Sequence, residues 1–199
     1  MGVIVDALLR FHNHVDLVVG RTSSMINNLL RSTVCRGKEF MTTLWVSHVR
    51  PLIEYGSCVW NVGYLGDMRR LESLQRRWTR EVDGLGGVEY VRRLHALGLF
   101  SVKGRLLRID LVKVWKCFHS EVEVGLGDLF ERARSERTRG HRYKLSIPVC
   151  RSEMRRRGFG VRCVETWNSL PVSLVDVSDV VAFKQGLDNF LGSSLFVPA

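Results

Sequence analysis

Arginine is the residue type whose number and spacing in this sequence point most clearly to a chemistry. Residues 132–162 contain eleven Lys and Arg but two acids, an excess of nine in a chain whose net charge is +10. A guanidinium group binds phosphate oxygens through two parallel hydrogen bonds. So concentrated a positive charge predicts a polyanionic partner, with nucleic acid favoured over a membrane surface. The alternative interpretation is an ordinary solvated surface.

A second group of arginines lies in the segment 68–82, which has helical periodicity. Apolar residues recur there every three or four positions, and Arg69, Arg76 and Arg80 share the opposite side. The two groups together predict a nucleic-acid-binding set: Arg69, Arg76, Arg77, Arg80, Arg137, Arg139, Arg142, Lys144, Arg155, Arg156 and Arg157. For the run 155–157, a solvated turn or a localisation signal is an equally open interpretation.

Aromatic residues are set among the basic ones, and unpaired bases stack on such rings. They include Tyr143, Phe159 and Trp167. For Phe159 and Trp167 the favoured interpretation is packing in a core, because large aromatic rings dominate protein interiors. The prediction of binding therefore rests on the arginines.

Patterns typical of catalysis are missing from the sequence. None of the nine aspartates is adjacent to another, so the paired carboxylates that hold metal ions in a polymerase have no local signature. The segment 84–87 lacks the lysine and hydroxyl of a phosphate-binding loop, and its glycines predict a helix end. We expect no catalytic residue and no cofactor.

Histidine and cysteine do not form a recognisable metal motif either. His12 and His14 are interpreted as a surface pair, because no cysteine or acid follows at a ligand-like distance. The spacing of His141, Cys150 and Cys163 matches no zinc motif. We expect no metal site.

The periodicity of apolar residues predicts a mostly α fold. The expected helices cover 15–30, 37–55, 68–82, 89–97, 101–120 and 178–191. Pro51 is expected to kink the second helix near Arg50, because proline lacks an N–H and clashes with the preceding turn. Short strands are expected at 3–5 and 143–149, and 159–167 is compatible with strand or helix.

Five scattered cysteines without a CxxC pair indicate reduced thiols and an intracellular protein. The longest run without Asp, Glu, Lys or Arg covers residues 55–66, which is shorter than the ~20 residues of a membrane span. We therefore expect a nuclear or cytoplasmic location and no membrane partner.

Ordered motifs run along nearly the whole chain. They are Gly2-Val3, Asp6, Leu8, Phe11 and His14-Val15; Leu44-Trp45-Val46-Ser47, Val49-Arg50-Pro51-Leu52, Glu54-Tyr55 and Val59-Trp60; Leu71-Glu72, Gln75-Arg76-Arg77 and Thr79-Arg80; Arg93-Leu94, Leu97-Gly98-Leu99, Arg105-Leu106-Leu107-Arg108 and Asp110-Leu111; Arg139-Gly140-His141, Lys144-Leu145, Arg162, Trp167-Asn168-Ser169-Leu170-Pro171, Phe183-Lys184 and Leu187-Asp188. In this order they resemble the C-terminal part of reverse transcriptases from non-LTR (LINE-type) retrotransposons of the jockey kind.

The resemblance implies a domain organisation. Residues 1–14 correspond to a remnant of the palm strand at the primer grip, and 15–87 to a helical, thumb-like domain. Residues 88–192 correspond to a basic post-thumb region, for which we expect an α+β fold with a few short strands. Residues 193–199 are expected to fray.

The same resemblance implies a function. Most of the palm with its catalytic aspartates lies outside this sequence, so we expect a truncated, non-catalytic part of an RNA-directed DNA polymerase that binds template RNA or primer–template duplex. An alternative is a protein-interaction module that binds another reverse transcriptase copy or a host protein through the apolar face around Trp45 and Trp60. A third interpretation is an unselected product of a degenerate retrotransposon.

Overall fold

The computed structural model describes residues 2–119, 129–133 and 141–199. The chain is mostly helical, as predicted. It divides into two compact units: one comprises the residues up to Leu106 together with Ser193–Ala199, and the other comprises Leu107–Gly192. The division therefore falls inside one helix. The domain boundaries implied by the resemblance, at residues 14, 87 and 192, stay a prediction.

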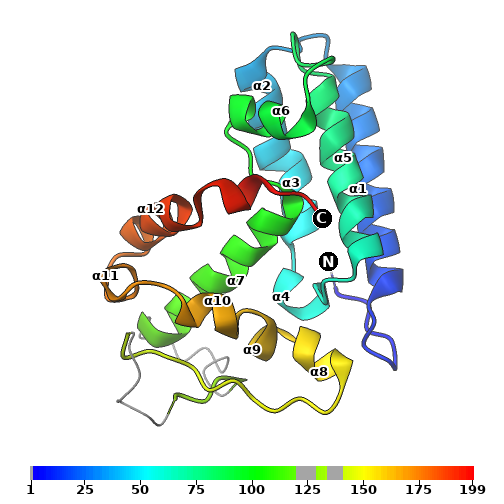
Figure 1. The fold of residues 1–199 in the computed structure, drawn as a ribbon. Coiled ribbons are helices and arrows are strands. Elements are labelled where there is room, and N and C mark those ends of the chain that lie inside the picture. Colours follow the sequence, from blue (N-terminus) through cyan, green and yellow to red (C-terminus); the bar gives the residue numbers. More distant parts are fainter. Residues whose placement is uncertain (1, 120–128, 134–140) are drawn as a thin grey trace. The chain divides into compact units, whose positions relative to one another are not determined.

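The first unit is built from helices, of which the α-helices are labelled in Figure 1. They are α1 (His12–Ser32), α2 (Lys38–Leu44), the π-helical turn η1 (Trp45–Val49), α3 (Arg50–Glu54), α4 (Ser57–Trp60), α5 (Leu65–Arg80), α6 (Tyr90–Leu97), the start of α7 (Val102–His119) and the C-terminal 3-10 helix η3 (Gly192–Phe196). Each predicted helix of this part of the chain is present, with bounds shifted by a few residues.

Helices α1 and α5 lie side by side and run in the same direction (Figure 1). His12 Nδ1 lies 2.7 Å from Asp67 Oδ2 near the start of both helices, and Arg77 reaches Asn27 near their ends. Tyr64 takes the N-cap position of α5, and Asp67 lies within the first turn of the helix. The Asp67 carboxylate therefore contacts α1 from inside that turn.

A widened, π-helical turn stands where Pro51 was expected to kink the second helix. Pro51 stands at the start of α3, and the backbone N–H of Arg50 bonds to the carbonyl of Trp45, five residues earlier. Proline cannot donate the usual i→i−4 hydrogen bond and its ring crowds the preceding carbonyl, so a π turn relieves the clash.

The core of the first unit is apolar and rich in tryptophan. Trp45, Trp60 and Trp78 are each at most 1% exposed, and the Trp78 indole donates to the carbonyl of Met41. The face of α5 that was predicted to be apolar is buried throughout. Trp45 and Trp60 were expected to lie on an exposed patch, and that prediction is wrong because neighbouring helices of the same unit cover both rings.

The C-terminal residues, which were expected to fray, are held in the first unit. Leu195 is fully buried, and its carbonyl accepts hydrogen bonds from the backbone N–H and the hydroxyl of Ser101, at 2.9 and 3.0 Å. A hydrophobic anchor combined with two hydrogen bonds is enough to order a short terminal segment.

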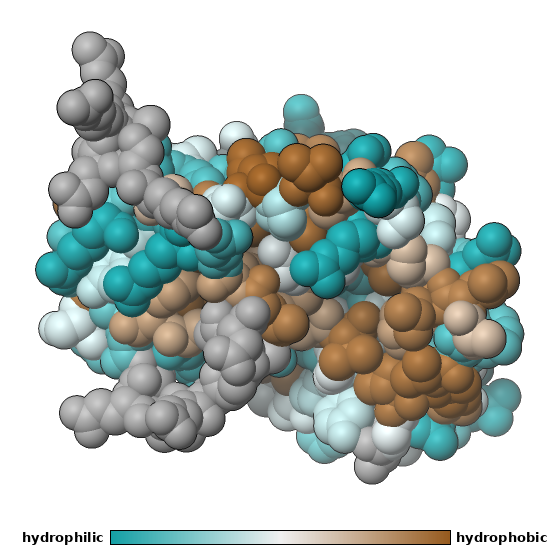
Figure 2. Space-filling model, turned by 90° about the horizontal axis from the view of Figure 1, so that it is seen from below, coloured by the Kyte–Doolittle hydropathy of each residue, from teal (hydrophilic) through white to brown (hydrophobic). Residues whose placement is uncertain are grey.

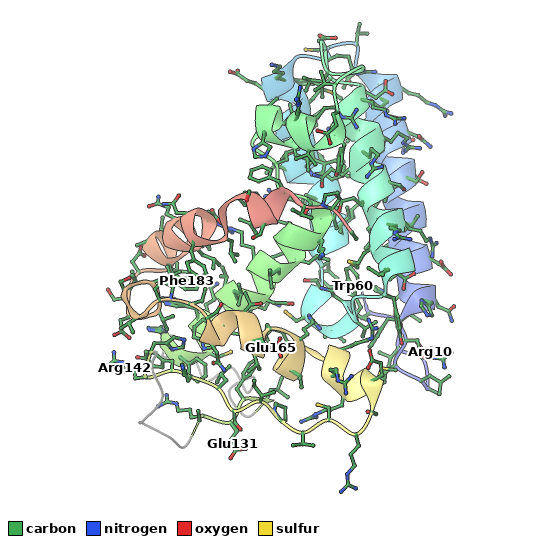
Figure 3. All side chains as sticks on the ribbon, viewed as in Figure 1. Arg10, Trp60, Glu131, Arg142, Glu165 and Phe183 are labelled. Carbon is green, nitrogen blue, oxygen red and sulfur yellow. The ribbon has the colours of Figure 1, made fainter. Side chains whose placement is uncertain are left out.

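The second unit contains the remainder of α7 and a series of short helices. These are α8 (Glu153–Arg157), α9 (Phe159–Arg162), α10 (Val164–Asn168), α11 (Val172–Val175) and α12 (Val180–Leu191). Its core gathers around Trp167, whose ring lies 6.3 Å from that of Phe183 and whose indole donates to the carbonyl of Tyr143. Phe183, labelled in Figure 3, comes from α12. Phe159 and Trp167 are therefore core residues, as favoured from the sequence.

The strands expected in this region do not form in the described residues. Around 143–149 the chain makes one isolated antiparallel bridge, between Arg132 and Leu145. The side-chain amide of Asn168 pairs with both the N–H and the carbonyl of Leu145, at 2.9 and 2.8 Å, and so satisfies groups that a neighbouring strand would otherwise bond. The segment 159–167, compatible with either type, is helical.

Two further sequence-based details change in the structure. Residues 3–5 were expected to form a strand, but they pair with no strand among the described residues; the N–H of Ile4 donates to Nδ1 of His14. The last helix was expected from residue 178, but α12 begins at Val180, because the side chain of Asp179 caps it by accepting from the N–H of Ala182.

Candidate nucleic-acid interface

Three arginines form an exposed row on α5, which we call the α5 arginine stripe: Arg69, Arg76 and Arg80. They stand on the side opposite the buried apolar residues. Within the part of the chain that the structure describes, none of the three makes an ion pair. Their positive charges are therefore not neutralised by an ion pair with a described residue.

Arg77, also predicted to bind nucleic acid, lies apart from this stripe. Its guanidinium is half-buried and points to α1, where Nη2 lies 3.2 Å from Oδ1 of Asn27 and 3.4 Å from the carbonyl of Ser23. Arg70 next to the stripe likewise pairs with Asp16 on α1, at 2.6 Å. These two arginines join helices rather than face a ligand.

The C-terminal end of the stripe meets a buried network at the start of α6. The Arg76 guanidinium lies over the ring of Tyr90, 4.7 Å from its centroid, and the Tyr90 hydroxyl donates to the buried carboxylate of Glu72. Glu72 also accepts from the N–H of Val102, at 3.0 Å. Burial raises the pKa of the Glu72 carboxyl.

The pKa of Tyr90 is raised as well, first by burial and then by the adjacent carboxylate. The phenol therefore stays protonated and serves as a fixed hydrogen-bond donor. This fixes the plane of the ring on which Arg76 rests. One arginine of the stripe is thus positioned before any ligand arrives.

Arg93 is a functional candidate that the sequence reading missed. It is 3% exposed, and its guanidinium donates to Oγ1 of Thr79 at 3.1 Å and to the carbonyls of Val88 at 3.0 Å and Arg76 at 3.3 Å. Burial, followed by the charges of Arg80 and Arg76, lowers the pKa of Arg93. The signal was an arginine on the apolar side of a short helix, at a position where a leucine would be expected.

The arginine run of α8 is partly neutralised. Glu153 pairs with Arg156 at 3.2 Å and with Arg157 at 3.0 Å, one turn along the same helix. Arg155 is exposed and makes no ion pair with a described residue. Exposed pairs of this kind are worth little and separate readily, so they do not prevent contact with a phosphate.

The remaining predicted residues of the second unit differ in their placement. Arg142 is 70% exposed and extends from the edge of the unit (Figure 3), 3.4 Å from a carboxylate oxygen of Asp176. Lys144 is half-buried beside the Trp167 core. Arg137 and Arg139 lie outside the described residues.

Potential metal ligands do not cluster in the described ranges. No group of three His, Cys, Asp or Glu side chains gathers there as a metal site would require. His141, considered with Cys150 and Cys163, has its Nε2 3.1 Å from the carbonyl of Trp167. No helix among residues 2–119, 129–133 and 141–199 is both long enough and apolar enough to cross a bilayer.

No protein-family model, curated protein or solved structure matches this chain. Functional inference therefore rests on the residues of the protein itself. The first unit carries Arg69, Arg76 and Arg80 on α5 and Arg93 on α6, and the second carries Arg155, Arg156 and Arg157 on α8 and a separate Arg142.

Proposed function

We propose that this chain is a non-catalytic, nucleic-acid-binding part of a LINE-type reverse transcriptase, and that it binds RNA or primer–template duplex through its arginines. The observation that carries this proposal is the α5 arginine stripe. Arginines that share one helical face and lack carboxylate partners in the described structure provide the geometry that phosphate oxygens bind.

Several of the motif residues pair with one another across long stretches of sequence. In the second unit Arg162 pairs with Asp110, and Arg108 pairs with Asp188. In the first unit Arg105 pairs with Glu54. These ion pairs engage Arg105, Arg108 and Arg162 within the fold, so the proposal assigns phosphate binding to other arginines.

A salt titration of binding tests the proposal. The full chain is titrated onto duplex DNA and onto single-stranded RNA between about 50 and 200 mM salt. Each phosphate contact adds about −0.9 to the log–log slope for duplex and about −0.7 for a single strand. Absence of binding at low salt, or binding that is independent of salt, contradicts the proposal.

Variants separate the stripe from general charge. The triple variant Arg69→Gln, Arg76→Gln and Arg80→Gln removes the stripe, and we expect it to flatten the duplex slope by about two to three units. The control removes the same charge from exposed arginines elsewhere in the unit: Arg10→Gln, Arg21→Gln and Arg31→Gln. An equal change in both variants shows that the stripe has no special role.

A second candidate function, protein association, rests on exposed apolar residues before α1. Ile4, Val5, Leu8 and Leu9 are each between 43% and 59% exposed. Figure 2 shows apolar surface between hydrophilic side chains on one face of the molecule. Such patches attract partners. Size-exclusion chromatography at several concentrations tests this: self-association that Leu8→Ser and Leu9→Ser abolish supports it, and a concentration-independent monomer argues against it.

A further inference from the structure

A cavity opens in the first unit where the end of α5 meets the start of α6. Its volume is about 660 Å³, within the range of small-ligand sites. Arg76 and Arg80 come from α5, Arg93 and Tyr90 from α6, and the turn at Gly86 and Gly87 forms a wall without side chains. Three arginines that converge on one hollow are a more specific arrangement than a basic surface.

The charge of this cavity is not balanced. Glu89 is the acid among the residues that line it, and its carboxylate accepts from the N–H of Val91 as the cap of α6. Among residues 2–119, 129–133 and 141–199, no carboxylate forms an ion pair with Arg76, Arg80 or Arg93. The lining therefore carries three positive charges against one negative charge.

Arg93 is a buried positive charge within this cavity. A buried cation without an acidic partner is unfavourable, and proteins usually pair it. The three groups that Arg93 bonds are a hydroxyl and two carbonyls, all neutral. A guanidinium presents five N–H donors, so three bonds leave two without an assigned acceptor. An anion in the cavity would supply the missing charge.

The arginines are also held in place in advance. Arg93 is locked by its three hydrogen bonds, and Arg76 rests on the ring of Tyr90. The hydroxyl of Tyr90 is in turn bound to Glu72. Ordering long side chains costs entropy on binding, and residues that are already ordered avoid that cost.

We propose that this cavity is a seat for one phosphate group of a nucleic-acid strand, which rests on the proposed function and assigns it a defined contact point. Arg76 and Arg80 present the guanidinium forks to the phosphate oxygens, and Arg93 supplies fixed positive charge at the base. The stripe then has two kinds of member: Arg69 is a surface charge, whereas Arg76 and Arg80 belong to a built site.

The test uses the full chain and two matched double variants. Arg76→Gln with Arg80→Gln removes two cavity arginines that are exposed at the surface, so the fold is retained. Arg31→Gln with Arg92→Gln removes two exposed arginines of the same unit that neither line the cavity nor belong to the stripe. Arg93 is left in place because its hydrogen bonds join α6 to α5.

Two probes are titrated onto each protein: inorganic phosphate, followed by NMR of the arginine Nε–H signals, and duplex DNA, followed by fluorescence anisotropy. In the unmodified chain we expect phosphate to shift the Arg93 Nε–H signal. The cavity variant should lose this shift and weaken duplex binding by about tenfold or more, as expected when charged hydrogen bonds are lost. The control should keep the shift and weaken duplex binding by about threefold or less.

The outcomes separate this inference from the proposed function. If the two variants weaken duplex binding equally and phosphate shifts no cavity signal, the proposed phosphate site is wrong. The proposed function is then kept, with binding through diffuse positive charge. If phosphate binds in the cavity but neither duplex DNA nor RNA binds the chain, both the proposed function and a nucleic-acid ligand are overturned. If nothing binds, both fall.

Discussion

Arg162 and Asp110 form a bidentate ion pair in the second unit, with Nε 2.8 Å from Oδ2 and Nη2 3.0 Å from Oδ1. The Asp110 side chain is 3% exposed and that of Arg162 is 15% exposed. Two parallel hydrogen bonds between buried charges fix the separation of α7 and α9. The pair therefore takes Arg162 out of the basic surface that the sequence suggested for 132–162.

Removing one partner of this pair should destabilise the second unit strongly. We expect Asp110→Asn to lower the free energy of unfolding by about 3–5 kcal/mol, because it removes the negative charge that accepts two hydrogen bonds from the guanidinium of Arg162. Urea unfolding measures the effect. The control is Glu153→Gln, which breaks the exposed pairs of α8 and should cost at most about 1 kcal/mol. Equal losses in the two variants would show that the buried pair is not structural.

Two identical glycine substitutions should have opposite effects in the first unit. A Cβ at Gly104 would lie 2.2 Å from the carbonyl oxygen of Leu195, so Gly104→Ala should destabilise by about 1–3 kcal/mol. A Cβ at Gly20, inside α1, would meet nothing within 4 Å, and Gly20→Ala should stabilise by about 0.5–1 kcal/mol. Thermal unfolding of both variants checks the signs. A harmless Gly104→Ala would mean that the C-terminal segment does not pack against α7.

Trp60 should be a strong contributor to the stability of the first unit. It is 1% exposed, and its indole N–H donates to the carbonyl of Tyr55 at 2.8 Å. We expect Trp60→Ala to cost about 3–5 kcal/mol, from lost burial and the cavity it leaves. Val59, its exposed neighbour, provides the control, and Val59→Ala should stay within about 0.5 kcal/mol of the unmodified chain.

His141 should make stability depend on pH. Burial lowers the pKa of this imidazole from the ordinary value of 6.5, against a smaller opposing effect of the hydrogen bond to Trp167. The folded state therefore binds the proton less readily than the unfolded state, and stability falls as pH drops below 6.5. Burial lowers the pKa of His14 in the same direction, whereas the raised pKa of Glu72 acts in the opposite sense.

A difference measurement isolates the histidine. The free energy of unfolding is compared between pH 7.5 and pH 5.5 for the unmodified chain and for His141→Gln, and we expect a smaller loss in the variant. NMR titration of the His141 ring should give a midpoint below 6.5. A midpoint at or above 6.5 would contradict the burial argument.

Local pattern predicted the helices well. The apolar spacing of α5 and the glycine that ends α6 depend on residues within one or two turns, so they are readable from the sequence. The break at Pro51 is equally local, because it follows from the covalent structure of proline. The strands were mispredicted because alternation alone does not reveal what the backbone bonds; at Leu145 that partner is the side chain of Asn168.

Only part of the candidate site could be predicted from the sequence. Exposure of Arg69, Arg76 and Arg80 follows from helical periodicity, but the sequence held no sign that Arg77 would turn to α1. Arg93 was not predicted because it follows Arg92, and two adjacent arginines usually indicate an exposed, solvated surface. Its burial depends on Thr79 and Val88, which lie on other segments.

By itself, the sequence determined the positions of the helices, the α5 face that carries free arginines and the excess of positive charge. Tertiary structure decided which arginines keep their charge available. Arg162 pairs with Asp110, 52 residues away in the sequence, and Arg108 pairs with Asp188, 80 residues away. Arg76, Arg80 and Arg93, in contrast, line one cavity and form no ion pair with a described residue. The physical reason is that neutralising a charge requires contact at a few ångströms, and such contacts between distant residues exist only once the chain is folded.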